Sequence, residues 1–357
     1  MKPGIIHVAS GREWRGGQNQ VRLLANALAR QGEFEQVVVT GRGTELARRL
    51  KNSGIPVLET GWTISLDPRV LLGVLQQLRG GPTLLHAHDS HALTIAVVAS
   101  RLKGTPLVAT RRVDFHLRRP GSWLQTDRVI AISEAVRSIL LVDGIPEERI
   151  TVVHSGINPE EVRSAPLCDI RKMLGLAPNM PLVVNVAALV PHKDHLTLLN
   201  AAAALNQRQL EAHWVVAGDG PMKNQLINRS RELGVENRVH FIGQTQHPLG
   251  VIREASVFVM SSREEGLGTS VLDAMALDIP VAATRAGGIP EMLSDGAGFL
   301  VDTGDGDGLA RAVERLLTDP ELRNQTRAAA GRHLAGFTDI AMADGVRSVY
   351  RSLLPTG

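Results

Sequence analysis

Short apolar runs alternate with segments of helical periodicity along the first half of the chain. A run at residues 5–10 is followed by apolar residues at Val21, Leu24, Ala25 and Leu28, a spacing typical of one helix face. The same pattern predicts further strands at residues 37–40, 57–58, 84–86, 107–110, 129–132 and 150–153. It predicts further helices at residues 46–50, 70–78, 93–102 and 135–142. This order indicates an α/β fold with a parallel sheet covered on both faces.

A polar, proline-containing segment at residues 154–181 interrupts the alternation, and we interpret it as a linker with a small helix near residues 170–174. Strands are expected again at residues 182–187, 213–217, 239–242, 257–260, 281–283 and 299–301. Helices are expected at residues 195–205, 222–233, 270–277, 309–317, 320–334 and 340–353. The pattern therefore predicts two similar Rossmann-like halves, with a ligand in the cleft between them. We place the domains at residues 1–160 and 161–338, followed by a final helical segment at 339–357.

Composition narrows the class of protein. The 357 residues contain 43% apolar and 21% charged residues, which is ordinary for a globular protein. There is no apolar run of 18 residues and no signal-peptide h-region at the N-terminus, so we expect no transmembrane helix and no secretion. A single cysteine, Cys168, excludes an intrachain disulfide and a cysteine-rich metal site. We therefore expect a cytoplasmic location.

Positive charge is concentrated in the first half. Residues 1–165 contain 21 Lys and Arg against 15 Asp and Glu, a balance of +6, whereas the remainder contains 18 against 21, a balance of −3. A basic half suits anionic lipid, a phosphorylated acceptor or nucleic acid. With one tyrosine and 3% aromatic residues, the chain lacks a base-stacking surface, so nucleic acid is not expected as a partner. Peripheral contact with the inner face of an anionic membrane remains an open alternative.

The segment 263–276 has the most informative pattern of chemistry. Glu265 lies in a glycine-containing turn after an apolar strand, and a helical segment follows directly, with Asp273 about two turns along it. A helix start offers free backbone N–H groups and a positive dipole end, which suit a phosphate. Ligands of parallel α/β sheets bind at the carboxyl ends of the strands. The segment therefore predicts a phosphorylated sugar or a nucleotide.

Three other loops at strand ends offer similar chemistry. Gly16 and Gly17 precede the first helix, where they permit close backbone approach to an anion, although an ordinary turn is the alternative. The loop lacks G-x-G-x-x-G, which argues against a nicotinamide dehydrogenase. Lys193 lies in a turn before a helix and suits a diphosphate, while Gly243 could offer its backbone to a nucleobase.

The first half contains two candidate clusters at strand ends. The sequence His86-Ala87-His88-Asp89-Ser90-His91 matches no zinc spacing, so we expect no metal and consider His88 a candidate base near a substrate hydroxyl. A structural role is equally open for each histidine. Arginines suit phosphate recognition, so we consider Arg111, Arg112 and His116 candidates for acceptor binding, with a solvated loop as the alternative. The late Asp305-Gly306-Asp307 is interpreted as a helix N-cap.

With these pieces placed, the chain resembles retaining glycosyltransferases of family 4, which have the GT-B fold. The resemblance covers nearly the whole chain. Its specific part is Glu265-Gly266-Leu267-Gly268 through Asp273-Ala274-Met275-Ala276, which is similar to the family's E-x7-E signature. Further similar segments are 16–17, 129–133, 183–193, 217–221, 241–243, 280–284 and 287–291.

The resemblance implies that the second domain binds a nucleotide-sugar donor and the first an acceptor, and that the final helix crosses back to the first domain. By analogy Glu265 faces the donor sugar and diphosphate, Lys193 neutralises phosphate charge, and Asp273 binds ribose hydroxyls. Together with the clusters above, the candidate catalytic residues are Glu265, Lys193 and His88. The candidate donor-binding residues are Gly16, Gly17, Gly243, Leu267, Gly268, Thr269 and Asp273.

We therefore expect a metal-independent, retaining hexosyltransferase that uses a UDP- or GDP-sugar and no cofactor, with a saccharide or lipid-linked acceptor of the cell envelope. The chain departs from the family pattern in having Asp273 for a glutamate and Ala188 for an arginine. Either Lys193 and the backbone suffice for the diphosphate, or an arginine from elsewhere, such as Arg263, Arg285 or Arg12, supplies the missing charge. A sugar-nucleotide epimerase and a non-catalytic nucleotide-sugar-binding partner are the alternatives.

Overall fold

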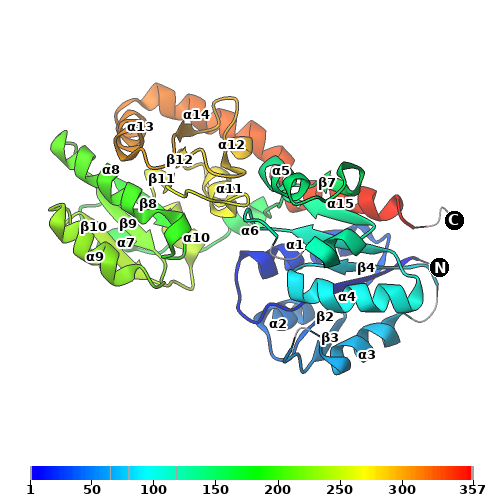
Figure 1. Cartoon of the computed structure of the whole chain (residues 1–357). Coiled ribbons are helices and arrows are strands. Elements are labelled where there is room, and N and C mark those ends of the chain that lie inside the picture. Colours follow the sequence, from blue (N-terminus) through cyan, green and yellow to red (C-terminus); the bar gives the residue numbers. More distant parts are fainter. Residues whose placement is uncertain (1, 65, 79–80, 118–119, 355–357) are drawn as a thin grey trace. The chain divides into compact units, whose positions relative to one another are not determined.

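The computed structural model describes residues 2–64, 66–78, 81–117 and 120–354 (Figure 1). It contains two compact units. Unit 1 comprises Met1–Gly156 together with Thr338–Gly357, and unit 2 comprises Ile157–Phe337. The chain thus leaves unit 1 near residue 156, against the expected boundary at 160, and returns to it at 338. The acceptor- and donor-binding roles given to the expected domains stay predictions.

Unit 1 is built on a parallel sheet in the order β3-β2-β1-β4-β5-β6-β7. Its strands are β1 (Gly4–Ala9), β2 (Glu35–Gly41), β3 (Val57–Thr60), β4 (Thr83–Ala87), β5 (Leu107–Arg111), β6 (Arg128–Ala131) and β7 (Ile150–Val152). Its α-helices are α1 (Gly16–Gln31), α2 (Glu45–Asn52), α3 (Pro68–Gln77), α4 (Ser90–Lys103), α5 (Glu134–Val142) and α15 (Asp339–Arg351). Two short 3-10 helices are η1 (Pro120–Gln125) and η2 (Glu147–Arg149).

Unit 2 contains a second parallel sheet in the order β10-β9-β8-β11-β12-β13. Its strands are β8 (Leu182–Val186), β9 (His213–Ala217), β10 (Val239–Gly243), β11 (Val257–Met260), β12 (Val281–Thr284) and β13 (Phe299–Val301). Its α-helices are α6 (Pro159–Arg163), α7 (Ile170–Met173), α8 (His195–Gln207), α9 (Lys223–Glu232), α10 (Pro248–Arg253), α11 (Thr269–Ala276), α12 (Ile289–Met292), α13 (Gly306–Thr318) and α14 (Pro320–His333). Two 3-10 helices are η3 (Pro191–Lys193) and η4 (Leu334–Phe337).

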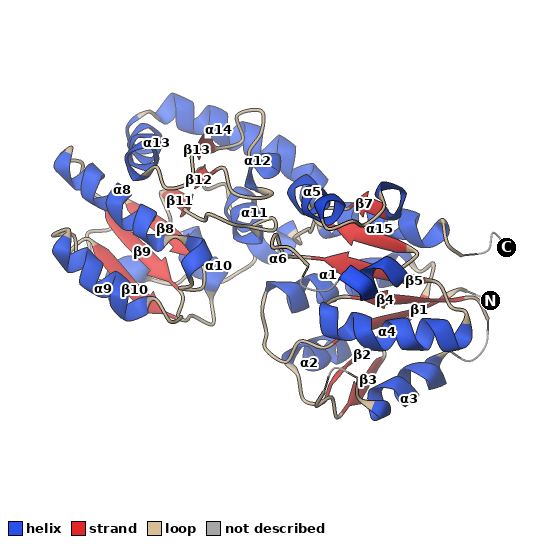
Figure 2. Ribbon diagram, in the orientation of Figure 1, coloured by secondary structure: helices blue, strands red, loops and turns tan. Residues whose placement is uncertain are grey.

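Helices cover both sheets, as the alternating pattern predicts (Figure 2). In unit 2, α8 packs against α13 and α9, whereas α10 and α11 contact each other. The core between the sheet and the α8, α9 and α13 layer includes Val183, Leu198, Trp214 and Leu309, each at most 1% exposed. Because the strands are buried on both faces, they appear in the sequence as short continuous apolar runs.

The last helix completes the core of unit 1. Helix α15 packs on α1, and its Val346, Val349 and Tyr350 belong to the same buried cluster as Ile5 and Leu28. Arg30 of α1 also pairs with Asp339 at 2.5 Å. The last twenty residues of the chain therefore belong to the same unit as the first 156.

Local signals fix several helix starts. The side chains of Asp89, Ser133 and Thr338 accept hydrogen bonds from backbone N–H groups in the first turns of α4, α5 and α15. Asp305 accepts from Gly308 N at 2.8 Å at the start of α13, so the expected N-cap is confirmed. Within the described ranges, no helix has the length and hydropathy needed to cross a bilayer.

Candidate functional site

Two loops of unit 2 meet at the carboxyl edge of its sheet. Strands β8 and β11 are parallel neighbours, so the loop that follows β8 (residues 187–194) and the loop that follows β11 (residues 261–268) leave the sheet side by side. Ser261 Oγ donates to the carbonyl of Lys193 at 3.1 Å, and Arg263 N donates to the carbonyl of His192 at 2.8 Å. The backbones on both sides of the predicted phosphate-binding lysine are thus fixed to the predicted acidic loop.

The structure brings Lys193 and Glu265 into direct contact. Lys193 Nζ pairs with Glu265 Oε2, and the two side chains are 16% and 13% exposed. Ser262 Oγ lies 3.4 Å from the same carboxylate oxygen. The ammonium and the carboxylate are mostly shielded from water but keep some exposed surface. A charged ligand can therefore reach the pair and interact with either group.

Glycines shape the backbone around Glu265. Gly268, with φ +86°, precedes α11, and Gly287, with φ +49°, lies so close to the carbonyl of Glu265 that a Cβ atom would collide with it. Gly288 N donates to that carbonyl at 3.1 Å. Left-handed φ values and close backbone approach are tolerated only by glycine here. The segment that follows β12 therefore packs against the backbone of Glu265 and fixes the acidic loop, residues 261–268.

Asp273 lies on α11 in an unusual environment. The residue is half-buried, and burial of its carboxyl group, together with the charge of Glu161, raises its pKa to about 7. No side-chain hydrogen bond or ion pair reaches it from the residues that the structure describes. This acid is a strong acceptor without a donor, a property that suits hydroxyl groups of a ligand.

The other donor-binding candidates offer backbone groups. Leu267 is 1% exposed, so its side chain belongs to the core, and Thr269 is the first residue of α11. Gly243 ends β10 with φ +74°, and its carbonyl accepts from Gly218 N at 2.9 Å. In unit 1, Gly17 lies in the first turn of α1, whose N-cap Arg15 makes no side-chain cap bond.

Three arginines were considered as replacements for the arginine that the family has at position 188. Arg263 Nε bonds to the buried carboxylate of Asp194 at 2.7 Å, directly beside Lys193. Arg285 lies 3.8 Å from the exposed Asp302, and Arg12, in unit 1, donates to the carbonyl of Trp62 at 2.6 Å. Of the three, Arg263 is attached to the same loop as Lys193.

Unit 1 contains a histidine group, by which we mean His7, His86 and His88, all at most 5% exposed. His7 Nδ1 lies 2.9 Å from His88 Nε2, and His7 Nε2 lies 3.1 Å from Gln36 Oε1. Arg112 Nη2 lies 3.4 Å from His88 Nδ1. Because Arg112 can only donate, we assign a single direction: Arg112 to His88, His88 to His7, and His7 to Gln36.

Each ring of the histidine group is neutral at ordinary pH. Burial lowers the pKa of His7 to about 4 and the pKa values of His86 and His88 well below the usual range. His86 bonds to Thr110 Oγ1 at 2.7 Å and to the hydroxyl of Tyr350 at 2.5 Å. Nitrogens of the three rings lie within 4.8 Å of one another and are the right donor type for a transition metal. Their lone pairs and protons are already used in this hydrogen-bonded network.

The predicted acceptor-binding residues lie in different environments. Arg111 is 5% exposed, donates to the carbonyl of Phe115 and lies 5.7 Å from the ring centre of Trp123. Arg112 Nε and Nη1 are buried without a hydrogen-bond partner among the described residues, and burial lowers its pKa to about 10. His116 is exposed and pairs with Asp143 at 2.6 Å. Of these residues only Arg112 contacts the histidine group.

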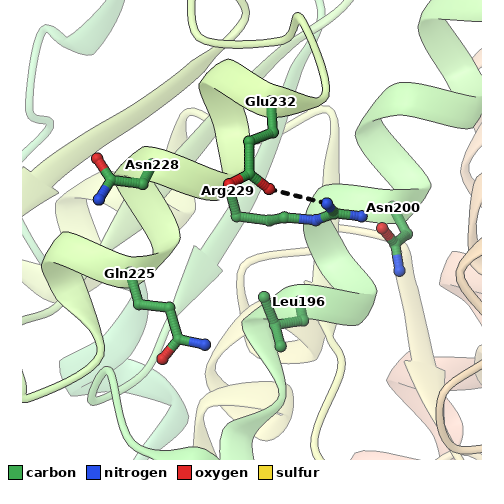
Figure 3. Close-up of a pocket in the computed structure, with 6 residues that line it drawn as sticks. All are labelled: Leu196, Asn200, Gln225, Asn228, Arg229 and Glu232. Atoms are coloured by element: carbon green, nitrogen blue, oxygen red, sulfur yellow. Dashed lines mark hydrogen bonds and ion pairs between the residues drawn. The ribbon is translucent and has the colours of Figure 1, made fainter.

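Sequence reasoning missed His7 and the ion pair of Asp194 with Arg263. His7 lies inside the first apolar strand, where one polar residue in an apolar run was the available signal. For the ion pair, the signal was an aspartate directly after Lys193 at a helix start. A further groove of about 580 Å³ lies between α8 and α9 (Figure 3). It is lined by Leu196, Asn200, Gln225, Asn228, Arg229 and Glu232, and none of these belongs to the candidate site.

Comparison with known families decides the class of protein. A model described as "Glycosyltransferase Family 4" matches residues 14–161, and one described as "Glycosyl transferases group 1" matches residues 169–333. The chain belongs to the family 4 type of GT-B glycosyltransferase. The first match lies within unit 1 except for its last five residues, and the second lies within unit 2. The predicted family is therefore confirmed.

Curated relatives of this glycosyltransferase carry glycosyltransferase names. It is 29% identical over 337 residues to "GDP-mannose-dependent alpha-(1-6)-phosphatidylinositol monomannoside mannosyltransferase" of Mycolicibacterium smegmatis, covering 90% of this chain and 84% of that protein. It is 23% identical over 320 residues to "UDP-Gal:alpha-D-GlcNAc-diphosphoundecaprenol alpha-1,3-galactosyltransferase" of Escherichia coli, covering 83% and 82%. Identity to "Lipopolysaccharide core biosynthesis glycosyltransferase LpsE" of Rhizobium meliloti is 34%, but only over 49% of this chain and 51% of that protein.

Solved structures confirm the predicted fold. A glycosyltransferase from Rickettsia africae superposes with a TM-score of 0.86 at 18% identity, covering 99% of this chain and 98% of that one. Anabaena Alr3699/HepE in complex with UDP-glucose gives 0.83 at 22% identity, covering 98% and 100%. The α/β, GT-B expectation is correct for this glycosyltransferase.

Proposed function

We propose that this glycosyltransferase transfers a hexose-type sugar from a UDP- or GDP-sugar to a saccharide or lipid-linked acceptor of the cell envelope. The transfer retains the anomeric configuration and needs no metal ion. The observation that carries the proposal is the Lys193–Glu265 ion pair at the carboxyl edge of the unit 2 sheet. The named activities of the mannosyl- and galactosyltransferase relatives support a nucleotide-sugar donor and an envelope acceptor.

The chemistry follows from the charges at this edge. When the sugar–phosphate bond breaks, negative charge develops on the leaving diphosphate, and groups already in place stabilise it most effectively. Lys193 and the backbone N–H groups at the start of α11 would supply that stabilisation without a divalent ion. Glu265, released from the lysine, would accept hydrogen bonds from sugar hydroxyls, and Asp273 would accept those from ribose.

We assign the acceptor to unit 1, where Arg112 Nε and Nη1 are buried without a hydrogen-bond partner among the described residues and Gly17 lies beside this side chain. His88, neutral and already a hydrogen-bond donor to His7, would orient an acceptor hydroxyl through Arg112 rather than take a proton itself. Arg111 and His116 remain candidates for acceptor contact. Location in the cytoplasm, with peripheral contact at the inner face of the membrane, is part of the same proposal.

The test starts with a thermal-shift screen of UDP, GDP, ADP and their sugars, since a ligand that binds only the native state raises the melting temperature. With the donor found, Glu265→Gln and Lys193→Ala are compared with the parent in donor hydrolysis and transfer. Removing one group that stabilises transition-state charge costs about 10²–10³-fold in kcat. Parent-level turnover in both variants would contradict the assignment of Glu265 and Lys193 to the active site. Epimerised donor without an acceptor, or tight binding without turnover, would point to the alternative functions.

A further inference from the structure

We propose that Arg263 and Asp194 form a positioning pair that keeps Lys193 facing Glu265 while the lysine exchanges its carboxylate partner for a phosphate. The inference rests on the proposed function, since it concerns how unit 2 receives a nucleoside diphosphate. Neither residue belongs to the acidic signature or to the donor-binding set, and here Arg263, considered above as a direct replacement for the family arginine, acts through Asp194 and Lys193 instead.

Asp194 is a buried acid with two bonds and an uncommon backbone. Its side chain is 3% exposed, Arg263 Nε lies 2.7 Å from its Oδ2, and Thr197 Oγ1 donates to the same oxygen at 2.6 Å. Its φ is +43°, a left-handed value that aspartate tolerates better than most residues. A buried carboxylate loses its hydration, so the guanidinium is the main compensation for its charge.

The ion pair of Arg263 with Asp194 lies where it can restrain Lys193. Asp194 directly follows Lys193 in the chain, so a shift of the Asp194 side chain and backbone would also change the orientation of Lys193. Arg263 also fixes the residue that precedes Lys193, because its backbone N–H donates to the carbonyl of His192 at 2.8 Å. One arginine therefore connects the acidic loop to the residues on both sides of Lys193.

Ligand entry makes this restraint matter. Without ligand, Lys193 pairs with Glu265 and this contact also holds the two loops together. A phosphate that takes over the ammonium weakens that contact, whereas the Arg263–Asp194 ion pair has no part in the exchange. The loops then stay in register, and the lysine is already oriented when the phosphate arrives, which lowers the entropy cost of binding.

The experiment measures UDP and GDP affinity by calorimetry, and donor KM, acceptor KM and kcat, for Arg263→Met and Asp194→Gly. Glycine accepts a φ of +43° without strain, so Asp194→Gly removes the carboxylate and leaves the backbone free to keep its path. We expect each variant to raise the nucleoside-diphosphate Kd and the donor KM about tenfold, a size typical of coupling between residues in contact, with acceptor KM unchanged. Arg263→Lys should restore part of the affinity. Arg229→Met, which removes an exposed ion pair of α9 with Glu232, is the matched control.

The decisive comparison places Arg263→Met in a Lys193→Ala background. If Arg263 acts through Lys193, the tenfold effect should largely disappear there, because the two changes are coupled. A tenfold effect of the same size without the lysine would show that Arg263 binds phosphate directly or acts elsewhere, and would overturn the proposal. Lower melting temperature with unchanged diphosphate affinity would overturn it too, as a purely structural role. Absence of diphosphate binding in the parent is a different failure, which removes the proposed function and this inference together.

Discussion

Replacement of Asp273 by asparagine should stabilise unit 2, and the gain in stability should increase as the pH rises from 4 to 7. The pKa of this carboxyl group is raised by burial to about 7 in the folded chain, against about 3.9 in an unfolded one. A difference of about three in pKa corresponds to roughly 4 kcal/mol if it is fully expressed. Because the residue as a whole is only half-buried, we expect about half of that, on the order of 2 kcal/mol.

The sign follows from which state holds the proton. Below pH 4 both the folded and the unfolded carboxyl groups are protonated, so Asp273 has no pH-dependent effect. Between pH 4 and 7 the unfolded chain releases the proton while the folded chain keeps it, so folding stability falls as pH rises. Above pH 7 the loss is complete and constant. Asparagine resembles the protonated acid and has no proton to lose, so it should avoid this loss.

The assay is urea denaturation of the parent and Asp273→Asn at intervals from pH 4.5 to 8.5, with unit 2 followed by the fluorescence of Trp214 in its core. The advantage of the variant should be smallest at pH 4.5 and should grow to about 2 kcal/mol at pH 8. Asp302→Asn, at a side chain 88% exposed, is the control and should show no such difference. Equal stability at pH 8, or a gain that does not change with pH, would refute a raised pKa at Asp273.

Three further predictions concern local contacts. Gly287→Ala should destabilise unit 2 by about 1–3 kcal/mol and weaken donor binding, because φ +49° and the carbonyl of Glu265 leave no space for a Cβ. The control is Gly296→Ala, at φ +79° with open space around it. It should destabilise unit 2 less in the same denaturation experiment and leave donor binding intact. Tyr350→Phe removes the hydroxyl 2.5 Å from His86 and should cost unit 1 about 1–2 kcal/mol, with no change in the unit 2 transition. The low pKa values of the histidine group, about 4 for the ring on β1, mean that unit 1 should lose stability as pH falls below about 6.5, where the unfolded rings take up protons first; a unit 1 midpoint that stays flat from pH 7 to 4.5 would contradict this.

The fold could be predicted because its signal is local. A strand buried on both faces, such as β11, needs an uninterrupted apolar run, and a helix that covers it needs apolar residues at intervals of three and four. Short helices such as α10 and α12 have too few residues to show this period, and they were not predicted. The contact of α15 with α1 joins residues about 300 positions apart, and the expectation that the last helix returns to the first domain came from family resemblance alone.

The candidate site was predictable only in part. Glu265 and Lys193 lie 72 positions apart, yet both follow strands that are neighbours in the sheet. Placement at carboxyl ends marked each as a phosphate ligand, and family resemblance associated the two. Nothing local marks Arg263 as the partner of Asp194, because an ion pair depends on where two loops meet. His7 was hidden in an apolar strand for the same reason, since its bonding to His88 depends on the pairing of β1 with β4.

The return of the chain to unit 1 has a consequence for synthesis on the ribosome. Unit 2 is one continuous stretch, Ile157–Phe337, so every residue it needs has been synthesised before the last helix. Unit 1 must wait for α15, which supplies the hydroxyl bonded to His86 and part of the core around Leu28. Folding during translation should therefore run against chain order, with the middle of the protein completed first and its beginning last. Until α15 is made, the apolar residues of β1 and α1 that it covers in the folded chain lack that cover, and exposed apolar surface of this kind is prone to aggregate.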